Sequence, residues 1–295
     1  MMSAPLRLMP SVRATQMRLR HPSDIDEDST LSETLARMPE QLYRYYGVAG
    51  DRRKWLRQLL VESKLYFASV GEFNDPFDSK MPVSFQASRL ELDTYWRRFA
   101  KEAEPNARMY QLKPKVRKLV NRALTSQGQQ KLAEQMQKSL EKNGTACFAP
   151  SATNTLLWAY YAEGHQGVAV RFKMTLPNLA RLGSNFVPVQ MQYRKKVPKL
   201  NFYGGTTVEF LTTVLGTKSA AWAHEEEWRL VLQADHGLRR IPESMIDAAI
   251  FGLKTTELTR QEVRQWNRER KQPVELFRVV RTPGSFDLAL EKEAL

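Results

Sequence analysis

Residues 222–232 read Trp-Ala-His-Glu-Glu-Glu-Trp-Arg-Leu-Val-Leu, and this stretch decides the fold. Its second half is aromatic and aliphatic apart from Arg229, which predicts a β-strand, whose successive side chains point to opposite faces. If the strand begins at the glutamates, Glu225, Glu227 and Arg229 share one face. The opposite face, which we expect in the core, then carries Trp228, Leu230 and Leu232.

Outward from this stretch, strands and helices alternate irregularly. Short runs rich in aromatic or β-branched residues predict strands, and apolar residues spaced three and four apart predict helices. The irregular order favours an α+β fold with a mixed or antiparallel central sheet over a doubly wound fold. We expect strands at residues 42–46, 64–69, from 147, 168–172, 186–194, 226–234 and 245–251, and helices at 51–63, 154–163 and 259–271.

Residues 88–143 differ from the rest of the chain in composition. One helix is expected before Pro105, and a second, strongly basic helical stretch follows it. We interpret this zone as a basic helical insertion in a single α+β domain of residues 39–280, with a mobile leader at 1–38 and a C-terminal tail at 281–295. The basic residues of the second stretch include Lys113, Lys115, Arg117, Lys118, Arg122 and Lys131.

The net charge is the strongest signal in the composition. The chain has 45 lysines and arginines against 32 aspartates and glutamates, a formal charge of +13. Such a charge attracts polyanions, and we expect a nucleic acid or a nucleotide as the partner. The competing interpretation is a basic surface without a specific ligand.

Other features of the composition narrow the class of protein. No apolar run approaches the roughly 20 residues that cross a bilayer, so no membrane segment is expected. The single cysteine, Cys147, excludes an intramolecular disulfide and a thiolate metal cluster. With four histidines in the chain, a histidine-rich metal site is not expected either. We expect a cytoplasmic protein that holds no metal.

Glu225, Glu227 and Arg229 form the first candidate site. Two carboxylates and a guanidinium on one face of a strand indicate that this face lines a cleft, where such groups carry chemistry. The alternative is an exposed face on which Glu227 pairs with Arg229, a contact worth at most ~1 kcal/mol.

Polar side chains in two other segments have two interpretations each. Residues 73–78, Phe-Asn-Asp-Pro-Phe-Asp, form either a rigid turn or a loop whose Asn74 and Asp78 reach a ligand ribose or base. Arg44, in the first expected strand, is either a surface charge or a bidentate phosphate ligand.

Residues 157–167 begin as a helix and end it at Gly164, a natural left-handed cap. Trp158 and Tyr161 share one helix face, which belongs either to the core or to a stacking platform. His165 lies in the loop that follows, where a rigid scaffold often presents ligand-binding side chains. It is either a structural histidine or a catalytic one.

Together these motifs resemble the bacterial family catalogued as domain of unknown function 2971. Its pattern runs L-Y-x-Y, then Y-F-x-S near F-N-D-P-F-D, then C-F near W-x-x-Y-A-x-x-H-x-G, then K-x-x-x-W-x-x-E-x-E followed by W-R or Y-R. The family often has a serine directly after C-F, where this chain has Ala149-Pro150-Ser151. The motifs match residues 42–45, 66–78, 147–167 and 218–229, so the resemblance spans roughly residues 41–253.

The order of these features is also similar to the ADP-ribosyltransferase superfamily. That resemblance implies an NAD-consuming transferase or glycohydrolase, with NAD as its substrate. In the Arg-Ser-Glu branch of the superfamily, the arginine steadies the NAD phosphates or ribose and the serine shapes the nicotinamide pocket. The last glutamate of E-x-E bonds the ribose and stabilises an oxocarbenium-like transition state. By position these roles fall on Arg44, Ser69 and Glu227.

Two other functions remain open at this point. The protein is either a nucleic-acid-binding accessory module that uses its basic helices, or a metal-dependent nuclease. A nuclease needs clustered carboxylates for its metal, and the chain offers Glu225, Glu227, Asp75 and Asp78.

Overall fold

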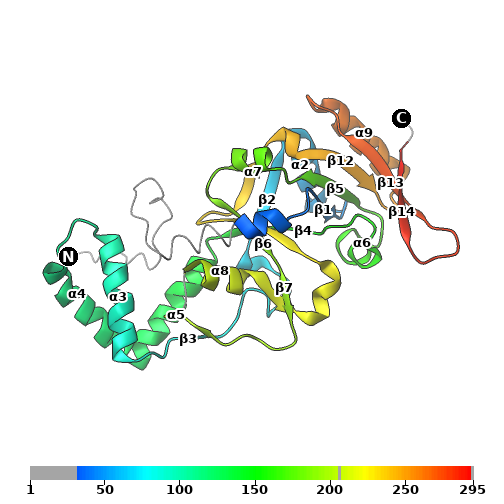
Figure 1. The fold of residues 1–295 in the computed structure, drawn as a ribbon. Helices are drawn as coiled ribbons and strands as arrows, with labels where there is room; N and C mark the ends of the chain where they lie inside the picture. Colours follow the sequence, from blue (N-terminus) through cyan, green and yellow to red (C-terminus); the bar gives the residue numbers. More distant parts are fainter. Residues whose placement is uncertain (1–31, 205–206, 294–295) are drawn as a thin grey trace.

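The computed structural model describes residues 32–204 and 207–293. Two five-stranded sheets form the body (Figure 1). The first sheet has the strand order β1-β5-β12-β13-β14. Its pairs are antiparallel except β12–β13, which run parallel and are connected by α9 (Glu257–Glu269). The strands are β1 (Gln41–Tyr46), β5 (Val168–Lys173), β12 (Ile246–Phe251), β13 (Glu275–Arg281) and β14 (Leu288–Lys292).

The second sheet has the order β11-β2-β4-β10-β6, and its pairs are antiparallel. β10 lies between β4 and β6, so Arg229 has Cys147 as its neighbour on one side and Val189 on the other. The strands are β11 (Gly237–Arg240), β2 (Lys64–Ser69), β4 (Gly144–Phe148), β10 (Trp228–Leu232) and β6 (Phe186–Gln190).

The two sheets meet where β1 approaches the end of β4. Tyr43 and Ala149 exchange two backbone hydrogen bonds of 2.8 Å each. One hydrophobic core takes side chains from both sheets, from α2 (Asp51–Glu62) and from α9. Across this core Phe148 of the second sheet and Phe172 of the first meet edge to face, with ring centres 5.0 Å apart.

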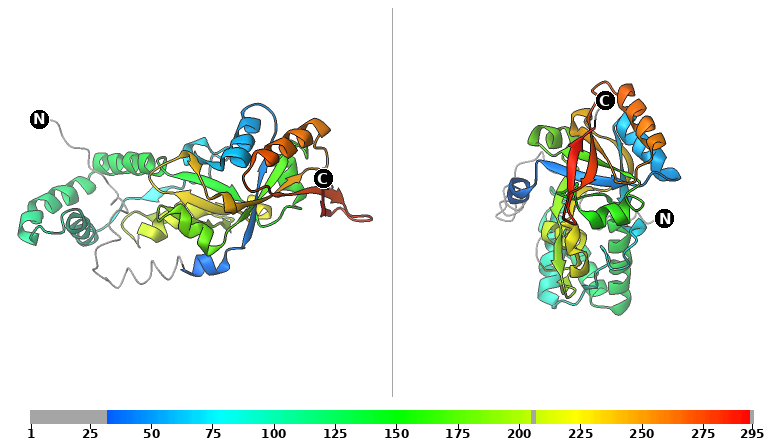
Figure 2. Two further views of the ribbon diagram at one scale, coloured as in Figure 1. Left: turned by 90° about the horizontal axis from the view of Figure 1, so that it is seen from above. Right: turned by 90° about the vertical axis from the view of Figure 1, so that its right-hand side faces the viewer.

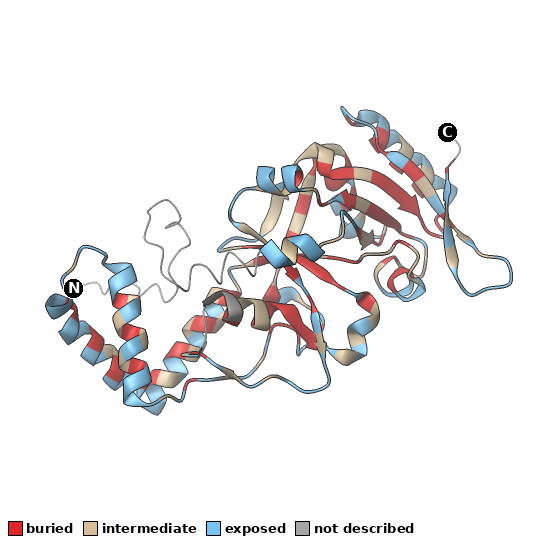
Figure 3. Ribbon diagram, viewed as in Figure 1, coloured by how far each residue is buried: buried red, intermediate tan, exposed pale blue. Residues whose placement is uncertain are grey.

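Three helices, α3 (Arg89–Ala103), α4 (Met109–Ala123) and α5 (Ser126–Leu140), form an arm at one end of the molecule (Figures 1 and 2). Each has a buried stripe and an exposed outer face (Figure 3). The buried stripes belong to a second core, which also includes Leu215 of α8 (Thr207–Gly216) and Val231 of β10. The arm is therefore anchored on the second sheet by apolar packing.

Shorter elements connect these parts. A third, smaller core packs α6 against the first sheet, with Trp158 fully buried in it. The connecting elements are η1 (Val70–Glu72), β3 (Val83–Ser84), α6 (Thr155–Tyr161), α7 (Leu176–Leu182), β7 (Gln192–Arg194), β8 (Leu200–Asn201), β9 (Thr217–Ser219), η2 (Ala220–Glu225) and η3 (Glu243–Met245).

The α+β class and the mixed and antiparallel sheets are confirmed, as is the burial of Trp228, Leu230 and Leu232 in the core. The start of the decisive strand differs from the prediction. β10 begins at Trp228: Glu225 is the last residue of a 3₁₀-helix, and Glu226 and Glu227 connect that helix to the strand. Glu226 has φ 45°, a left-handed conformation that interrupts any extended chain at this position.

The other expected boundaries also shift in places. The basic helical stretch is divided into α4 and α5, because the hydroxyl of Thr125 accepts a hydrogen bond from Gly128 N and starts a new helix. Residues 281–295, expected as a tail, contribute β14 to the first sheet. Of the expected leader at 1–38, residues 1–31 lie outside the described residues, and 32–37 are helical. Within the described ranges, no helix is both long and apolar enough to cross a bilayer.

The contact between the sheets can be tested at Phe172. Replacing it by alanine is expected to lower the free energy of unfolding by about 3–5 kcal/mol, because a fully buried ring is lost and a cavity remains. Chemical denaturation followed by circular dichroism measures this change. The matched control is Phe286→Ala at a fully exposed position, expected to change stability by less than about 0.5 kcal/mol. Equal losses in the two variants would contradict the assignment of the core.

Candidate functional site

A buried group of charged residues lies on the face of the second sheet that points away from the shared core. It contains three carboxylates and two cations, all of them buried. We call this group the ion network. Its members are Asp78, Lys218, Glu225, Glu227 and Arg229.

Arg229 is the centre of the ion network, and its side chain is 1% exposed. The guanidinium donates to both oxygens of Asp78, over 2.9 and 2.5 Å. Its Nε donates to Glu227 Oε1 over 2.7 Å, and Nη1 also donates to the carbonyl oxygen of Leu215 over 2.8 Å. The pair of Glu227 and Arg229 predicted from the sequence therefore exists, but it is buried rather than exposed.

The turn at residues 73–78 supplies Asp78 to the ion network. Asp75 stabilises the turn locally, because its Oδ1 accepts a hydrogen bond of 2.9 Å from Phe77 N. The ring of Phe73 lies against the guanidinium of Arg229, with 5.0 Å between the guanidinium carbon and the ring centre. Asn74, by contrast, is exposed. The segment thus forms the expected turn, and Asp78 contacts Arg229; contact of Asn74 or Asp78 with a ligand stays a prediction.

Lys218, on β9, is the second cation. Its Nζ donates to Glu225 Oε2 over 2.5 Å and to Glu227 Oε2 over 3.0 Å. The ring of Trp222 lies over the ammonium group at 5.0 Å. Lys218 was not among the residues singled out by sequence reasoning, although it begins the motif that leads to Arg229. A strand prediction for this segment gave no reason to bring Lys218 to the glutamates, because the 3₁₀-helix that returns the chain to it was not expected.

Two tyrosines bond to the glutamates from other elements. The hydroxyl of Tyr161, at the end of α6, donates to Glu225 Oε1 over 2.6 Å. The hydroxyl of Tyr193 on β7 accepts from the backbone N–H of Glu227 over 2.7 Å. Tyr161, a candidate residue of the sequence analysis, thus contacts the ion network, whereas Tyr193 lies in a segment that carried no motif.

The two glutamates have opposite electrostatic environments. Burial would raise the pKa of Glu227, but Arg229 and Lys218 outweigh it and lower that pKa to about 2. For Glu225, burial dominates and raises the pKa, although Lys218 and Tyr161 both donate hydrogen bonds to it. Two neighbouring carboxylates whose pKa values are pushed apart are suited to different roles in one reaction.

Three aromatic side chains lie beside the ion network: Tyr160 of α6 and Trp222 and His224 of η2. Their ring centres are 6.1 to 6.5 Å apart. Tyr160 is 59% exposed, while Trp222 also covers Lys218. We call these residues the aromatic trio. It offers flat apolar surface next to buried charge, an arrangement typical of small-molecule sites.

Asn154 fixes the aromatic trio relative to α6. Its side-chain oxygen caps the helix by accepting from the N–H groups of Leu156 and Leu157. Its side-chain nitrogen donates to the carbonyl oxygen of His224 over 2.6 Å. One side chain therefore holds the start of α6 and the end of η2 together.

Arg44 and the ion network have Cys147 as a common neighbour. Burial raises the pKa of the Cys147 thiol; Glu227 raises it further, whereas the nearby Arg229 and Arg44 lower it. Arg44 is half-buried on β1 and donates from Nη1 to the carbonyl oxygen of Tyr66 over 3.2 Å. Its guanidinium also lies over the ring of Tyr46, with 5.5 Å between the guanidinium carbon and the ring centre.

The remaining predicted residues have contacts of other kinds. Ser69 caps η1: its hydroxyl accepts from Gly71 N and donates to the carbonyl oxygen of Glu141. Trp158 is fully buried and donates from its indole nitrogen to the carbonyl oxygen of Ala152. His165 stacks against Trp158, with ring centres 6.3 Å apart. For Trp158 the structure agrees with the core interpretation.

Breaking the ion network at its centre tests its contribution to stability. Arg229→Met is expected to lower the free energy of unfolding by about 3–5 kcal/mol, because Asp78 and Glu227 would then lack their main cation while buried. The control is Arg278→Met, which breaks the exposed pair with Glu291 and is expected to cost at most ~1 kcal/mol. Urea denaturation compares the two, and a loss below ~1 kcal/mol for Arg229→Met would contradict the network's role.

The lowered pKa of Glu227 predicts how its contribution depends on pH. Since the folded-state pKa is about 2 and the ordinary value is 4.5, its stabilising contribution is complete above pH 4.5 and is lost as the pH falls toward 2. Unfolding of the native protein and of Glu227→Gln, measured between pH 2 and 6, should therefore give a stability difference that shrinks below pH 4.5. A difference that stays constant across this range would refute the shift.

The chain matches no family model, no curated protein and no solved structure. The resemblance to the bacterial family and to ADP-ribosyltransferases stays a prediction.

Proposed function

We propose that the protein consumes NAD, as an ADP-ribosyltransferase or an NAD glycohydrolase, at the ion network and the aromatic trio. In this reaction the bond between ribose C1′ and the nicotinamide nitrogen breaks, and neutral nicotinamide leaves with the bonding electrons. An oxygen of water or of an acceptor then bonds to C1′ and loses its proton. Positive charge develops on the ribose between these events.

The position of the aromatic trio beside the two glutamates carries the proposal. A nicotinamide or adenine ring is flat and stacks on aromatic side chains. Tyr160 presents an exposed ring, and Tyr161, next to it in the chain, bonds Glu225 directly. Trp222 of the trio covers Lys218, which bonds both glutamates, so a ring stacked on the trio would carry its attached ribose toward the carboxylates.

The opposite pKa shifts support separate roles for the glutamates. Glu227 stays ionised at all physiological pH values, so its charge is available to stabilise a developing oxocarbenium ion. Glu225 has a raised pKa and is the better candidate to take up the proton of the attacking oxygen. Arg229 and Lys218 act as positioning residues, because their contacts are with the glutamates themselves.

Arg44 is the candidate for the NAD phosphates. Its guanidinium uses Nη1 for Tyr66, and the other donors remain for an anion. Ser69, in contrast, has its hydroxyl committed to backbone groups, and we assign it no part in the chemistry.

Release of nicotinamide from NAD by the purified protein tests the proposal. Glu227→Gln removes the negative charge while preserving shape, and we expect the rate to fall by about 10²–10³-fold, as for the loss of one electrostatic stabiliser. The matched control is Glu226→Gln: this neighbour is exposed and makes no contact with the network among the described residues, so the rate should not change.

If Glu227→Gln fails to fold, a second variant still tests the proposal. Tyr160 lies at the surface. Because Tyr160→Ala removes a stacking surface, we expect this variant to raise the KM for NAD more than it lowers kcat. The assays include water alone, a protein extract and a nucleic acid as acceptors. The proposal fails if native protein releases no nicotinamide under any of these conditions, or if Glu226→Gln loses as much activity as Glu227→Gln.

A further inference from the structure

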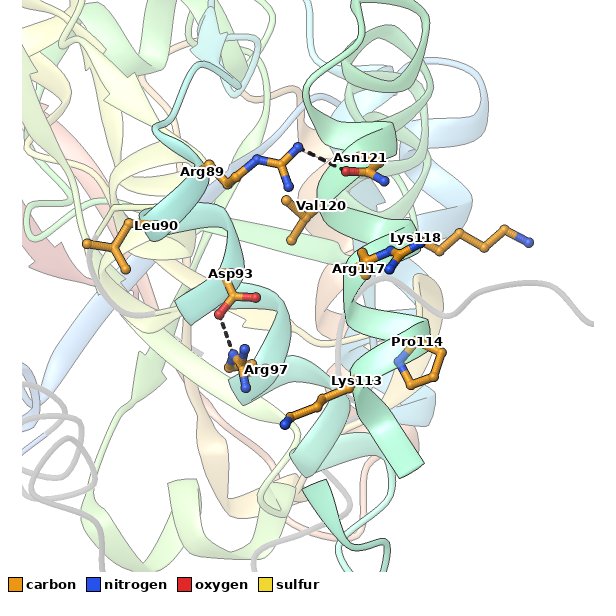
Figure 4. A pocket seen from close by; sticks show the side chains of 10 residues that line it. All are labelled: Arg89, Leu90, Asp93, Arg97, Lys113, Pro114, Arg117, Lys118, Val120 and Asn121. Carbon is orange, nitrogen blue, oxygen red and sulfur yellow. Dashed lines mark hydrogen bonds and ion pairs between the residues drawn. The ribbon is translucent and has the colours of Figure 1, made fainter. Parts of the chain in front are cut away.

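The arm carries a cleft of about 1180 Å³ between α3 and α4, and none of the residues that line it belongs to the ion network (Figure 4). Five of the ten residues that line it are basic, and the single acidic one, Asp93, is paired with Arg97 on its own helix. The basic residues are Arg89, Arg97, Lys113, Arg117 and Lys118. This surplus of positive charge is a feature that the proposed function does not use.

The charges are arranged in rows along the two helices. Arg89, Asp93 and Arg97 are spaced by four residues on α3, and Lys113 and Arg117 are spaced likewise on α4. Residues four apart lie on the same face of a helix, about 6 Å from one another along the axis. In Figure 4, Lys113 points toward α3, and Lys118 extends outward at the rim.

The cations of α4 have few partners. The helix contains five basic residues and no acidic one. Lys115 pairs with Glu104 of the loop after α3. Within the described part of the chain, no ion pair is formed by Lys113, Arg117 or Lys118, and all three are exposed. Their mutual repulsion is relieved when an anion binds, which favours binding of a polyanion.

We propose that this cleft binds the phosphate backbone of a double-stranded nucleic acid. A duplex presents a continuous row of phosphates and keeps its bases stacked inside, so rows of Lys and Arg are sufficient to hold it. Proteins that bind single strands add aromatic side chains on which bases stack. Among the ten described residues that line the cleft, none is aromatic, which favours the duplex.

The arm also has the rigidity that such a site requires. Its helices pack through buried residues, including Leu92 and Trp96 of α3 and Val116 and Val120 of α4. Asn121 of α4 accepts a hydrogen bond from Arg89 of α3 across the cleft, over 3.1 Å. Buried packing and this hydrogen bond thus join the two helices that carry the rows of charge.

Fluorescence anisotropy with labelled 20-base-pair DNA and RNA duplexes and with the corresponding single strands tests this proposal. We expect both duplexes to bind, with log K falling linearly against log salt concentration, because each neutralised phosphate contributes about −0.9 to the slope. Lys113→Gln, Arg117→Gln and Lys118→Gln combined should weaken binding and reduce the magnitude of the slope by about 2–3. If only the DNA duplex or only the RNA duplex binds, that duplex is the ligand of the cleft.

Two variants serve as controls. Arg268→Gln with Lys271→Gln removes exposed charge from the other end of the molecule, near the end of α9, and should leave duplex binding unchanged. Lys113→Arg combined with Lys118→Arg keeps the positive charge and should bind the duplexes as the native protein does. The proposal is overturned if the triple variant binds like the native protein, if the Arg268 and Lys271 variant loses as much affinity, or if single strands or polyglutamate bind more tightly than the duplexes.

This test is independent of the proposed NAD chemistry. The triple variant is expected to release nicotinamide at the native rate, because none of its three residues contacts the ion network or the aromatic trio. Native protein that binds duplexes but releases no nicotinamide would contradict only the NAD proposal, and native protein that releases nicotinamide but binds no duplex would contradict only the proposal for the cleft.

Discussion

The burial of Arg229 in the middle of a sheet is the constraint on which the rest of the structure depends. A guanidinium removed from water loses several kcal/mol of hydration free energy unless ionised partners and hydrogen-bond acceptors replace the water. Here Asp78, Glu227 and the carbonyl oxygen of Leu215 replace it. Because these groups come from a turn, the residue before β10 and the end of α8, one side chain sets the relative positions of three distant segments.

Much of the fold was predictable from the sequence, and the reason is periodicity. The alternation of Trp228, Leu230 and Leu232 predicted a buried strand face, and the apolar spacing in residues 51–63 predicted a helix. The start of β10 was not predictable, since an extended strand and a 3₁₀-helix ending in a left-handed residue fit the same run of glutamates. Local patterns fix the type of an element better than its ends.

For the site, sequence reasoning identified members but not their partners. Glu225, Glu227, Arg229, Asp78 and Tyr161 were all singled out, and the structure brings them together. The contact between Asp78 and Arg229 joins residues 151 positions apart, and no local pattern reports a contact of that kind. Lys218, Trp222 and His224 were overlooked as site residues because their role depends on how η2 folds back beside α6.

Contacts in the arm are local in sequence, whereas the sheets are joined by distant residues. α3, α4 and α5 follow one another in the chain and pack against each other, while β1 pairs with β5 and β4 with β10, 80 or more positions further on. Local contacts close early and distant ones late, because loop closure costs entropy. During synthesis, a nascent chain can therefore fold its helical arm before Arg229 has been made. Asp78 then has no cationic partner until the ribosome has added 151 more residues.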